Sequence, residues 1–113
     1  MPQTEKDTAI LQHIIRYCLD IEDAVLRFGN SYRSFANDKE YRNACALCIL
    51  QIGELVGHLS ADFKSQHSDI PWRQIQAMRN VVAHAYGSVR VETTWETIQE
   101  DIPFLKDFCL QQI

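Results

Sequence analysis

Glycine and proline are scarce in this sequence, with four glycines and three prolines among 113 residues. Because tight turns depend on these two residues, their scarcity argues against a fold of many short strands and favours a few long helices. Apolar residues make up 46% of the chain, which is enough for a hydrophobic core, and this length corresponds to one domain. We therefore expect a single all-α domain over residues 1–113.

Long apolar runs and sorting signals are missing as well. No stretch of about eighteen consecutive apolar residues occurs, which excludes a transmembrane helix. The sequence begins Met-Pro-Gln-Thr-Glu-Lys-Asp, without the basic and then apolar pattern of a signal peptide. We expect a cytoplasmic protein with no membrane partner.

Several catalytic patterns are also absent. The sequence has no glycine-rich phosphate loop, no Ser-His-Asp arrangement and no carboxylate cluster suited to a metal ion. Of the four cysteines, Cys45 and Cys48 have a C-x2-C spacing that is typical of half a metal or redox site, but no second Cys or His pair matches it. Both lie in an apolar helical pattern, so we expect buried thiols in a reducing compartment, no metal and no cofactor.

Charge is distributed unevenly along the chain. The net charge of −4 at first argues against a nucleic-acid partner. Residues 1–63 hold six Lys/Arg and nine Asp/Glu, residues 64–91 hold four and one, and residues 92–113 hold one and five. The single basic segment is therefore residues 64–91, with a charge of +3. A small basic site on an acidic body suits local phosphate contact better than broad duplex binding.

Apolar residues recur at steps of three or four along four segments, which predicts four long helices. The first helix is expected to begin near Thr4, with Asp7 in the capping-box position, and to end at Gly29 and Asn30. Its expected core stripe consists of Ile10, Ile14, Cys18, Ile21, Val25 and Phe28. Residues 31–37 are interpreted as a connector.

The second helix is expected to begin at Asn37, with Glu40 as its capping-box partner. Its core stripe consists of Tyr41, Cys45, Cys48, Ile52, Leu55 and Leu59. Gly53 costs roughly 1 kcal/mol of helix propensity against alanine, so we expect another helix to pack closely there. Glu54 is either a partner of an arginine or histidine or a solvated carboxylate.

The polar stretch 60–69 predicts one short helix, capped by Ser60 with Phe63 facing inward. His58 and His67 are expected to be exposed to solvent.

The third long helix is expected within Ile70–Ser88, with Pro71 at the first helical position and Gly87 at the stop. Its apolar face consists of Trp72, Ile75, Met78 and Val82. The fourth helix begins near Val91, and Pro103 is expected to kink or split it. Its heptad-like seam consists of Val91, Trp95, Ile98, Ile102, Leu105 and Cys109. Together these elements predict an up-and-down bundle of four long helices plus a short one.

The third helix also concentrates four polar groups, on Arg79, Asn80, His84 and Tyr86. Metal-free RNA cleavage needs a group that moves the proton of the 2′-hydroxyl, and a histidine with a pKa of about 6.5 suits that task. It also needs a cation for the phosphate, which an arginine supplies through its planar fork of donors. The competing interpretation is structural: a surface ion pair for Arg79, a helix-dipole contact for His84 and simple packing for Tyr86.

Helix geometry places a condition on this chemistry. At about 100° per residue, Arg79 and Tyr86 share a face, whereas His84 lies about 140° from Arg79. Either the helix unwinds around His84, or His84 meets Arg79 of a second subunit. A straight helix in a monomer is therefore not the active arrangement.

The spacing Arg79-x4-His84-x-Tyr86 resembles the R-x(4–6)-H-x-Y signature of HepT-type toxins in the HEPN ribonuclease superfamily. The resemblance extends to Ile52-Gly53-Glu54, Ile70-Pro71-Trp72, Trp95-Glu96-Thr97-Ile98 and Asp101-Ile102-Pro103. Asn80 matches the polar residue that often follows the motif arginine. Gly87 departs from the family, in which an aromatic residue is common there.

The resemblance implies a HEPN-type helical bundle that forms a homodimer with two facing motifs. It implies the toxin of a type VII-like toxin–antitoxin pair, a metal-independent endoribonuclease in which Arg79, His84 and Asn80 act on RNA. It further implies an MntA-like nucleotidyltransferase antitoxin that transfers AMP to Tyr86 and silences the toxin. The alternative is a non-catalytic helical partner or substrate-binding subunit of a minimal nucleotidyltransferase, in which His84 has no catalytic duty.

Overall fold

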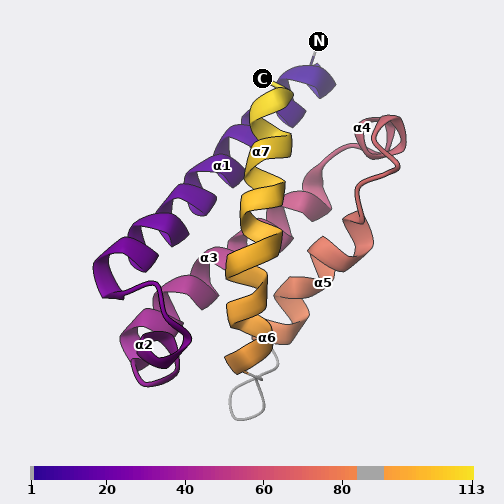
Figure 1. The fold of residues 1–113 in the computed structure, drawn as a ribbon. Coiled ribbons are helices and arrows are strands. Elements are labelled where there is room, and N and C mark those ends of the chain that lie inside the picture. The colour runs from indigo at the N-terminus through magenta and orange to yellow at the C-terminus, as the bar shows by residue number, and fades with distance from the viewer. Residues whose placement is uncertain (1, 84–90) are drawn as a thin grey trace.

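The computed structural model describes the backbone of residues 2–83 and 91–113 and the side chains of residues 5–79 and 91–113. The described chain forms α1 (Pro2–Phe28), α2 (Tyr32–Ala36), α3 (Lys39–His58), α4 (Ala61–Gln66), α5 (Trp72–Ala83), α6 (Val91–Glu96), the π-helical turn η1 (Thr97–Asp101) and α7 (Ile102–Gln111). No strand occurs among these residues. The long elements run alternately up and down, and the start of α1 and the end of α7 lie at one end of the bundle (Figure 1). The predicted all-α bundle is confirmed.

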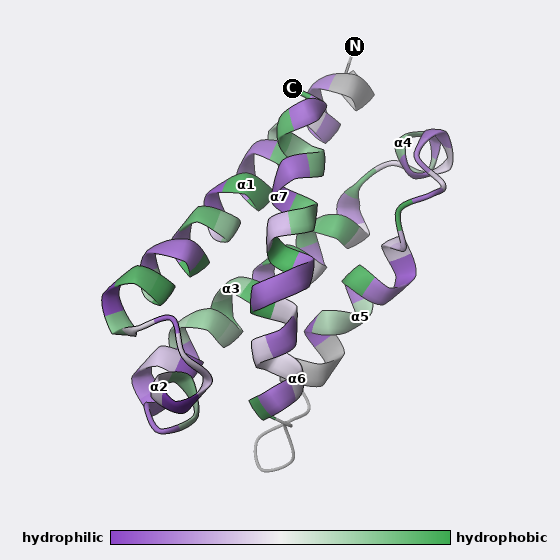
Figure 2. Cartoon of the chain, in the orientation of Figure 1, coloured by the Kyte–Doolittle hydropathy of each residue, from purple (hydrophilic) through white to green (hydrophobic). Residues whose placement is uncertain are grey.

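Apolar side chains from all four long elements fill the core. Polar and apolar residues alternate turn by turn along the helices, as their amphipathic sequences require (Figure 2). The buried set includes Ile14, Cys18 and Ile21 of α1, Tyr41, Cys45 and Ile52 of α3, Ile75 of α5, and Ile98, Ile102, Leu105 and Cys109 of the last helix. The predicted stripes are therefore largely correct, although they omitted Leu11, Ile49 and Val56, which are also buried.

The predicted cap of the first helix is wrong. The helix already begins at Pro2, so Thr4 lies inside it. Asp7 is only 7% exposed and accepts hydrogen bonds from Ser60 N at 2.9 Å and Ser60 Oγ at 2.6 Å. Its carboxylate is satisfied at the start of α4, where unpaired backbone N–H groups favour a negative charge. Asp7 therefore ties α1 to the N-terminus of α4.

The connector predicted at residues 31–37 contains the short helix α2, capped by Ser31, whose Oγ accepts from Ser34 N at 3.0 Å. Asn37 closes α2 and does not begin the next helix. Asp38 caps α3 instead, because its Oδ1 accepts from Glu40 N at 3.0 Å and Tyr41 N at 3.2 Å. The predicted start was thus one residue early.

The predictions for Gly29, Ser60 and His58 are confirmed. Gly29 follows α1 with a φ of 115°, a left-handed conformation that suits the end of a helix. Ser60 caps α4, with its Oγ accepting from Phe63 N at 3.1 Å. His58 is exposed, but the prediction for His67 is wrong. The His67 ring is half-buried, with its centroid 4.7 Å from that of Phe63 and 5.1 Å from that of Phe108.

The last helix passes through Pro103 without a break. The turn η1 ends at Asp101, two residues before the proline, and Ile102 N donates to Thr97 O, five residues earlier. Proline has no N–H to donate to the preceding turn, and a π-helical turn is a common form of such a local change in the hydrogen-bond pattern. The predicted interruption therefore takes the form of a wider turn. Among the described residues, no helix is long and apolar enough to cross a membrane.

Burial accounts for the cysteines. Cys18, Cys45 and Cys109 are buried, Cys48 is half-buried, and none forms a disulfide. Desolvation raises the pKa of Cys45 to about 12 and that of Cys48 to about 11. The C-x2-C pair therefore consists of protonated thiols inside the bundle, as expected.

Candidate functional site

Arg79 lies on α5 where that helix presses against α3. A Cβ built on Gly53 would lie 2.6 Å from Arg79 Cβ, 3.2 Å from Arg79 N and 3.2 Å from Gln76 O. No residue with a side chain fits at such distances, so Gly53 permits this close approach. The prediction that a helix packs closely at Gly53 is confirmed, and the helix is the one that carries Arg79.

The Arg79 side chain reaches back across the same contact. Its Nε donates to Glu54 Oε1, and each of the two side chains is 42% exposed. Two consecutive residues of α3 thus contact Arg79: Gly53 lies against its backbone, and Glu54 accepts from its guanidinium. Of the two alternatives for Glu54, the arginine partner is the one that the structure contains.

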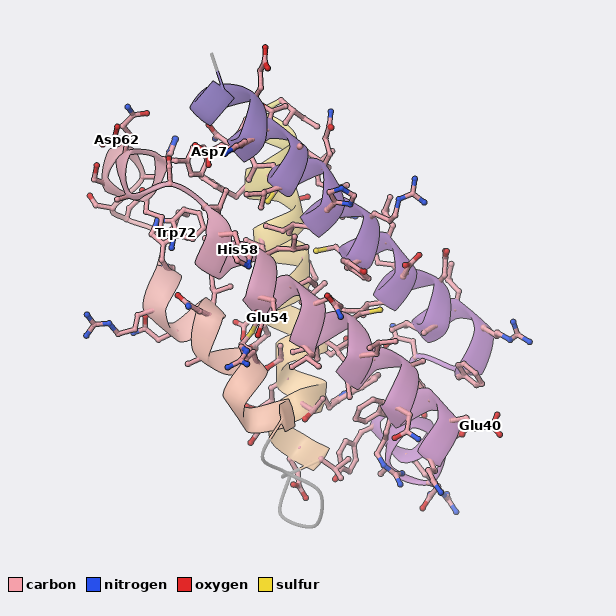
Figure 3. All side chains as sticks on the ribbon, turned by 180° about the vertical axis from the view of Figure 1, so that it is seen from behind. Asp7, Glu40, Glu54, His58, Asp62 and Trp72 are labelled. Carbon is pink, nitrogen blue, oxygen red and sulfur yellow. The ribbon has the colours of Figure 1, made fainter. Side chains whose placement is uncertain are left out.

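Further polar groups line the seam between α3 and α5. A Cβ on Gly57 would lie 2.9 Å from Gln76 Nε2, so the Gln76 amide covers this second glycine. His58 is exposed one turn after Glu54, and both residues lie on the side of α3 that borders α5 (Figure 3). The seam therefore presents a guanidinium, a carboxylate, an amide and an imidazole.

Gln76 and Gly57 were not among the residues predicted to contribute to the site. The signal was the spacing of four between Gly53 and Gly57, which places both glycines on one face of α3. Two glycines on one helical face indicate a long close contact with a neighbour, and the structure shows that Arg79 and Gln76 lie opposite them.

The other predicted site residues are not described at side-chain level. Asn80 belongs to α5, but its side chain lies outside the described residues, as does that of Val82. His84, Tyr86 and Gly87 fall in residues 84–90, which also lie outside them. The relation of Arg79 to His84, and with it the choice between unwinding and a second subunit, stays a prediction.

Two grooves occur elsewhere on the described part of the chain. One of about 300 Å³ lies between α1 and the last helix and is lined by apolar residues such as Val25 and Ile102. The other, of about 200 Å³, lies between α5 and the last helix, beside Met78 and the buried Thr94. Neither of these two grooves is lined by Arg79 or Glu54.

Chemically, the seam can present a positioned cation to an anionic group. A guanidinium offers several N–H donors in one plane and matches the oxygens of a phosphate. The described residues contain no group of three or more His, Cys, Asp or Glu that could hold a metal ion.

Comparison with known proteins agrees with the resemblance in the sequence. The family described as "Ribonuclease HepT-like" matches residues 11–111. A protein of Caldanaerobacter subterraneus that is provisionally named as an RNase is 34% identical over 96 residues, which cover 85% of this chain and 84% of that protein. One of Thermococcus cleftensis, named probable ribonuclease HepT, is 40% identical over 75 residues, covering 66% of this chain and 68% of that protein.

A protein of Methanocaldococcus jannaschii that is also provisionally named as an RNase is 32% identical over 100 residues, with 87% of this chain and 79% of that protein covered. No solved structure matches the chain significantly.

Proposed function

This chain belongs to the family of HepT-like ribonucleases, and on that premise we propose that it cleaves RNA without a metal ion, as the toxin of a toxin–antitoxin pair. The names of its relatives support RNA as the substrate. The position of the motif within the single basic segment supports a local contact with phosphate.

In the proposed reaction the 2′-hydroxyl of RNA attacks the adjacent phosphorus. His84 takes the proton from that hydroxyl or delivers one to the leaving 5′-oxygen, which is worth roughly a hundred- to ten-thousandfold in rate. The new O2′–P bond forms as the P–O5′ bond breaks, which leaves a 2′,3′-cyclic phosphate and a 5′-hydroxyl. Arg79 neutralises the charge that builds up on the phosphate. Asn80 holds the phosphate or the His84 ring, and Tyr86 donates to a phosphate oxygen or stacks on a base.

The observation that supports this proposal most directly is the placement of Arg79. A buried arginine would be a structural residue, and a fully solvated one would have no fixed direction. Arg79 is instead half-exposed, with its backbone fixed by Gly53 and its Nε held by Glu54. A cation that is both accessible and oriented suits the stabilisation of a transition state.

We also propose that the active form is a homodimer. On a regular helix His84 points about 140° away from Arg79, so one protomer with a straight helix does not bring them together. Pairing two motif helices places the histidine of one protomer near the arginine of its partner.

For the control of this activity we propose that an MntA-like nucleotidyltransferase, the cognate antitoxin, transfers AMP from ATP to the phenol oxygen of Tyr86 and releases pyrophosphate. Each AMP adds a phosphodiester charge and a bulky adenosine two residues after His84. Repulsion and steric hindrance would then keep RNA phosphates away from Arg79.

The test is cleavage of single-stranded RNA by the purified, unmodified protein in EDTA. We expect wild-type cleavage that yields 2′,3′-cyclic phosphate ends and is lost in Arg79→Ala and in His84→Ala. The matched controls are Arg16→Ala and His13→Ala, which alter exposed residues of the same types on α1. A linear 3′-hydroxyl product would exclude attack by the 2′-hydroxyl.

The alternative function, a non-catalytic partner of a nucleotidyltransferase, gives a different outcome. The protein would then show no cleavage even when intact mass proves Tyr86 unmodified. Expression in a bacterial host would not be toxic, and His84→Ala would change nothing.

A further inference from the structure

Glu54 is the single acidic residue between Glu40 and Asp62 in the sequence. Its pairing with Arg79 is therefore not one of many contacts on a surface rich in acidic side chains. It directly follows Gly53, whose missing side chain lets Arg79 of α5 approach the backbone of α3. The carboxylate therefore lies where the guanidinium of Arg79 can reach it along the surface of the seam.

The two contacts act on different parts of Arg79. Gly53 fixes the distance and register between the helices, because Arg79 N and Cβ and Gln76 O all lie within 3.2 Å of where a Cβ would be. Glu54 then fixes the far end of the side chain through Nε. An arginine side chain has several rotatable bonds, so a contact at each end restricts it far more than either contact alone.

We propose that Glu54 is the positioning residue of the nuclease site and presets the Arg79 guanidinium for the scissile phosphate. The proposal rests on the ribonuclease function proposed above. The carboxylate engages the Nε edge, which sets the plane of the guanidinium before RNA arrives. Glu54 itself does not touch the substrate in this arrangement.

A purely stabilising role for this ion pair fits the geometry less well. Both side chains are 42% exposed, and exposed ion pairs contribute little to stability because water and salt screen them. Orientation, by contrast, matters at any exposure, since misplacing a catalytic group by about 1 Å can cost roughly a hundredfold in rate. Glu54 should therefore affect the rate of cleavage much more than the melting temperature.

Enzyme kinetics on single-stranded RNA test this difference. We expect Glu54→Ala to lower kcat by roughly ten- to a hundredfold with little change in KM or Tm. Glu54→Gln retains an oxygen that accepts from Arg79 Nε, so it should recover part of the lost kcat. The matched control is Glu22→Gln, because Glu22 forms a 2.5 Å ion pair with Lys106 between α1 and α7, and its side chain is 39% exposed against 42% for Glu54.

Chemical rescue separates positioning from other effects of the charge. In Arg79→Ala, guanidinium ion added to the buffer should restore part of the cleavage, because Glu54 can bind the ion near the position of the lost side chain. The double variant Arg79→Ala with Glu54→Ala should show no such rescue. Equal rescue in the two proteins would overturn the proposal.

An NMR measurement keeps the proposal testable apart from activity. The Arg79 Nε–H resonance, assigned by its loss in Arg79→Lys, should shift in Glu54→Ala and exchange faster with water. The same resonance in Glu22→Gln should stay unchanged. If wild-type protein fails to cleave RNA, the proposed function falls while this measurement still decides whether Glu54 holds Arg79. An unmoved resonance, or a Glu54→Ala protein with wild-type kcat, would overturn the positioning role.

Discussion

Gly53 of α3 and Arg79 of α5 approach so closely that no side chain fits between them, since a Cβ on Gly53 would lie 2.6 Å from Arg79 Cβ. The atoms opposite Gly53 are Arg79 Cβ and N and Gln76 O, and the two backbone atoms cannot turn aside as a flexible side chain can. The position of the proposed catalytic arginine is thus coupled to the absence of one methyl group on the neighbouring helix.

Gly53→Ala should therefore push α5 away from α3. Overpacking of this kind costs about 1–3 kcal/mol. The better helix propensity of alanine, about 1 kcal/mol, offsets part of this cost. We expect a net loss of stability in urea unfolding, and a larger loss of RNA cleavage because Arg79 moves with α5.

Gly57→Ala is the matched control for this substitution. The nearest atom to its Cβ would be Gln76 Nε2 at 2.9 Å, which is the far end of a flexible side chain. Gln76 can swing aside, so the gain in helix propensity of up to about 1 kcal/mol should remain. Equal destabilisation by the two substitutions would contradict the close contact at Gly53.

The buried carboxylate of Asp7 gives a second prediction. Asp7 accepts from both the backbone N and the hydroxyl of Ser60 and joins the start of α1 to the start of α4 (Figure 3). Hydrogen bonds to a charged group contribute about 1.5–3 kcal/mol, so Asp7→Ala should lower the free energy of unfolding by at least that amount. Chemical denaturation measures this change. Asp20→Ala, an exposed position on the same helix, should cost far less.

Local periodicity predicted the long helices because apolar residues three or four positions apart lie on one buried face of a helix. Gly53 was predictable for a related reason, since a glycine inside a helix costs propensity and needs a compensating contact. The pairing of Glu54 with Arg79 was only one of two alternatives, because the sequence does not determine the register between α3 and α5, that is, which residues of the two helices lie opposite each other. The contacts at Gly53 and Gly57 set that register.

The failed predictions share a physical cause. Capping rules treat each helix by itself, yet Asp7 is used by a helix start 53 residues away. The interruption predicted at Pro103 is present, but as the π-helical turn Thr97–Asp101, a form that the local rule for proline does not specify. Sequence alone does not weigh such distant contacts against local preferences.

Alkaline pH provides a third prediction. Burial raises the pKa of Cys18 and Cys109 from 9.0 to about 12, so these thiols stay neutral in the folded protein where they would ionise in the unfolded chain. The stability that they contribute is complete below pH 9.0 and is lost as the pH rises toward 12. Urea unfolding should therefore show lower stability at about pH 10 than at neutral pH.

Thiol labelling checks the same property at a milder pH. Because the thiolate is the reactive form, the native protein at about pH 8 should react very slowly with a disulfide reagent. Unfolding should expose all four cysteines. Rapid labelling of Cys45 or Cys48 in the native state would contradict their burial and would favour a redox role for the C-x2-C pair.

Modification of Tyr86 is the last prediction. Co-expression with the cognate nucleotidyltransferase should add AMP-sized increments to the intact mass of the toxin, and Tyr86→Phe should abolish them because the phenol oxygen is the acceptor. Tyr32→Phe is the matched control, since Tyr32 is 38% exposed and should leave the increments in place. The modified wild type should lose RNA cleavage because each added phosphodiester charge repels the phosphates that Arg79 is proposed to bind. A wild-type protein that stays unmodified beside an active partner would mean that the antitoxin acts by another route.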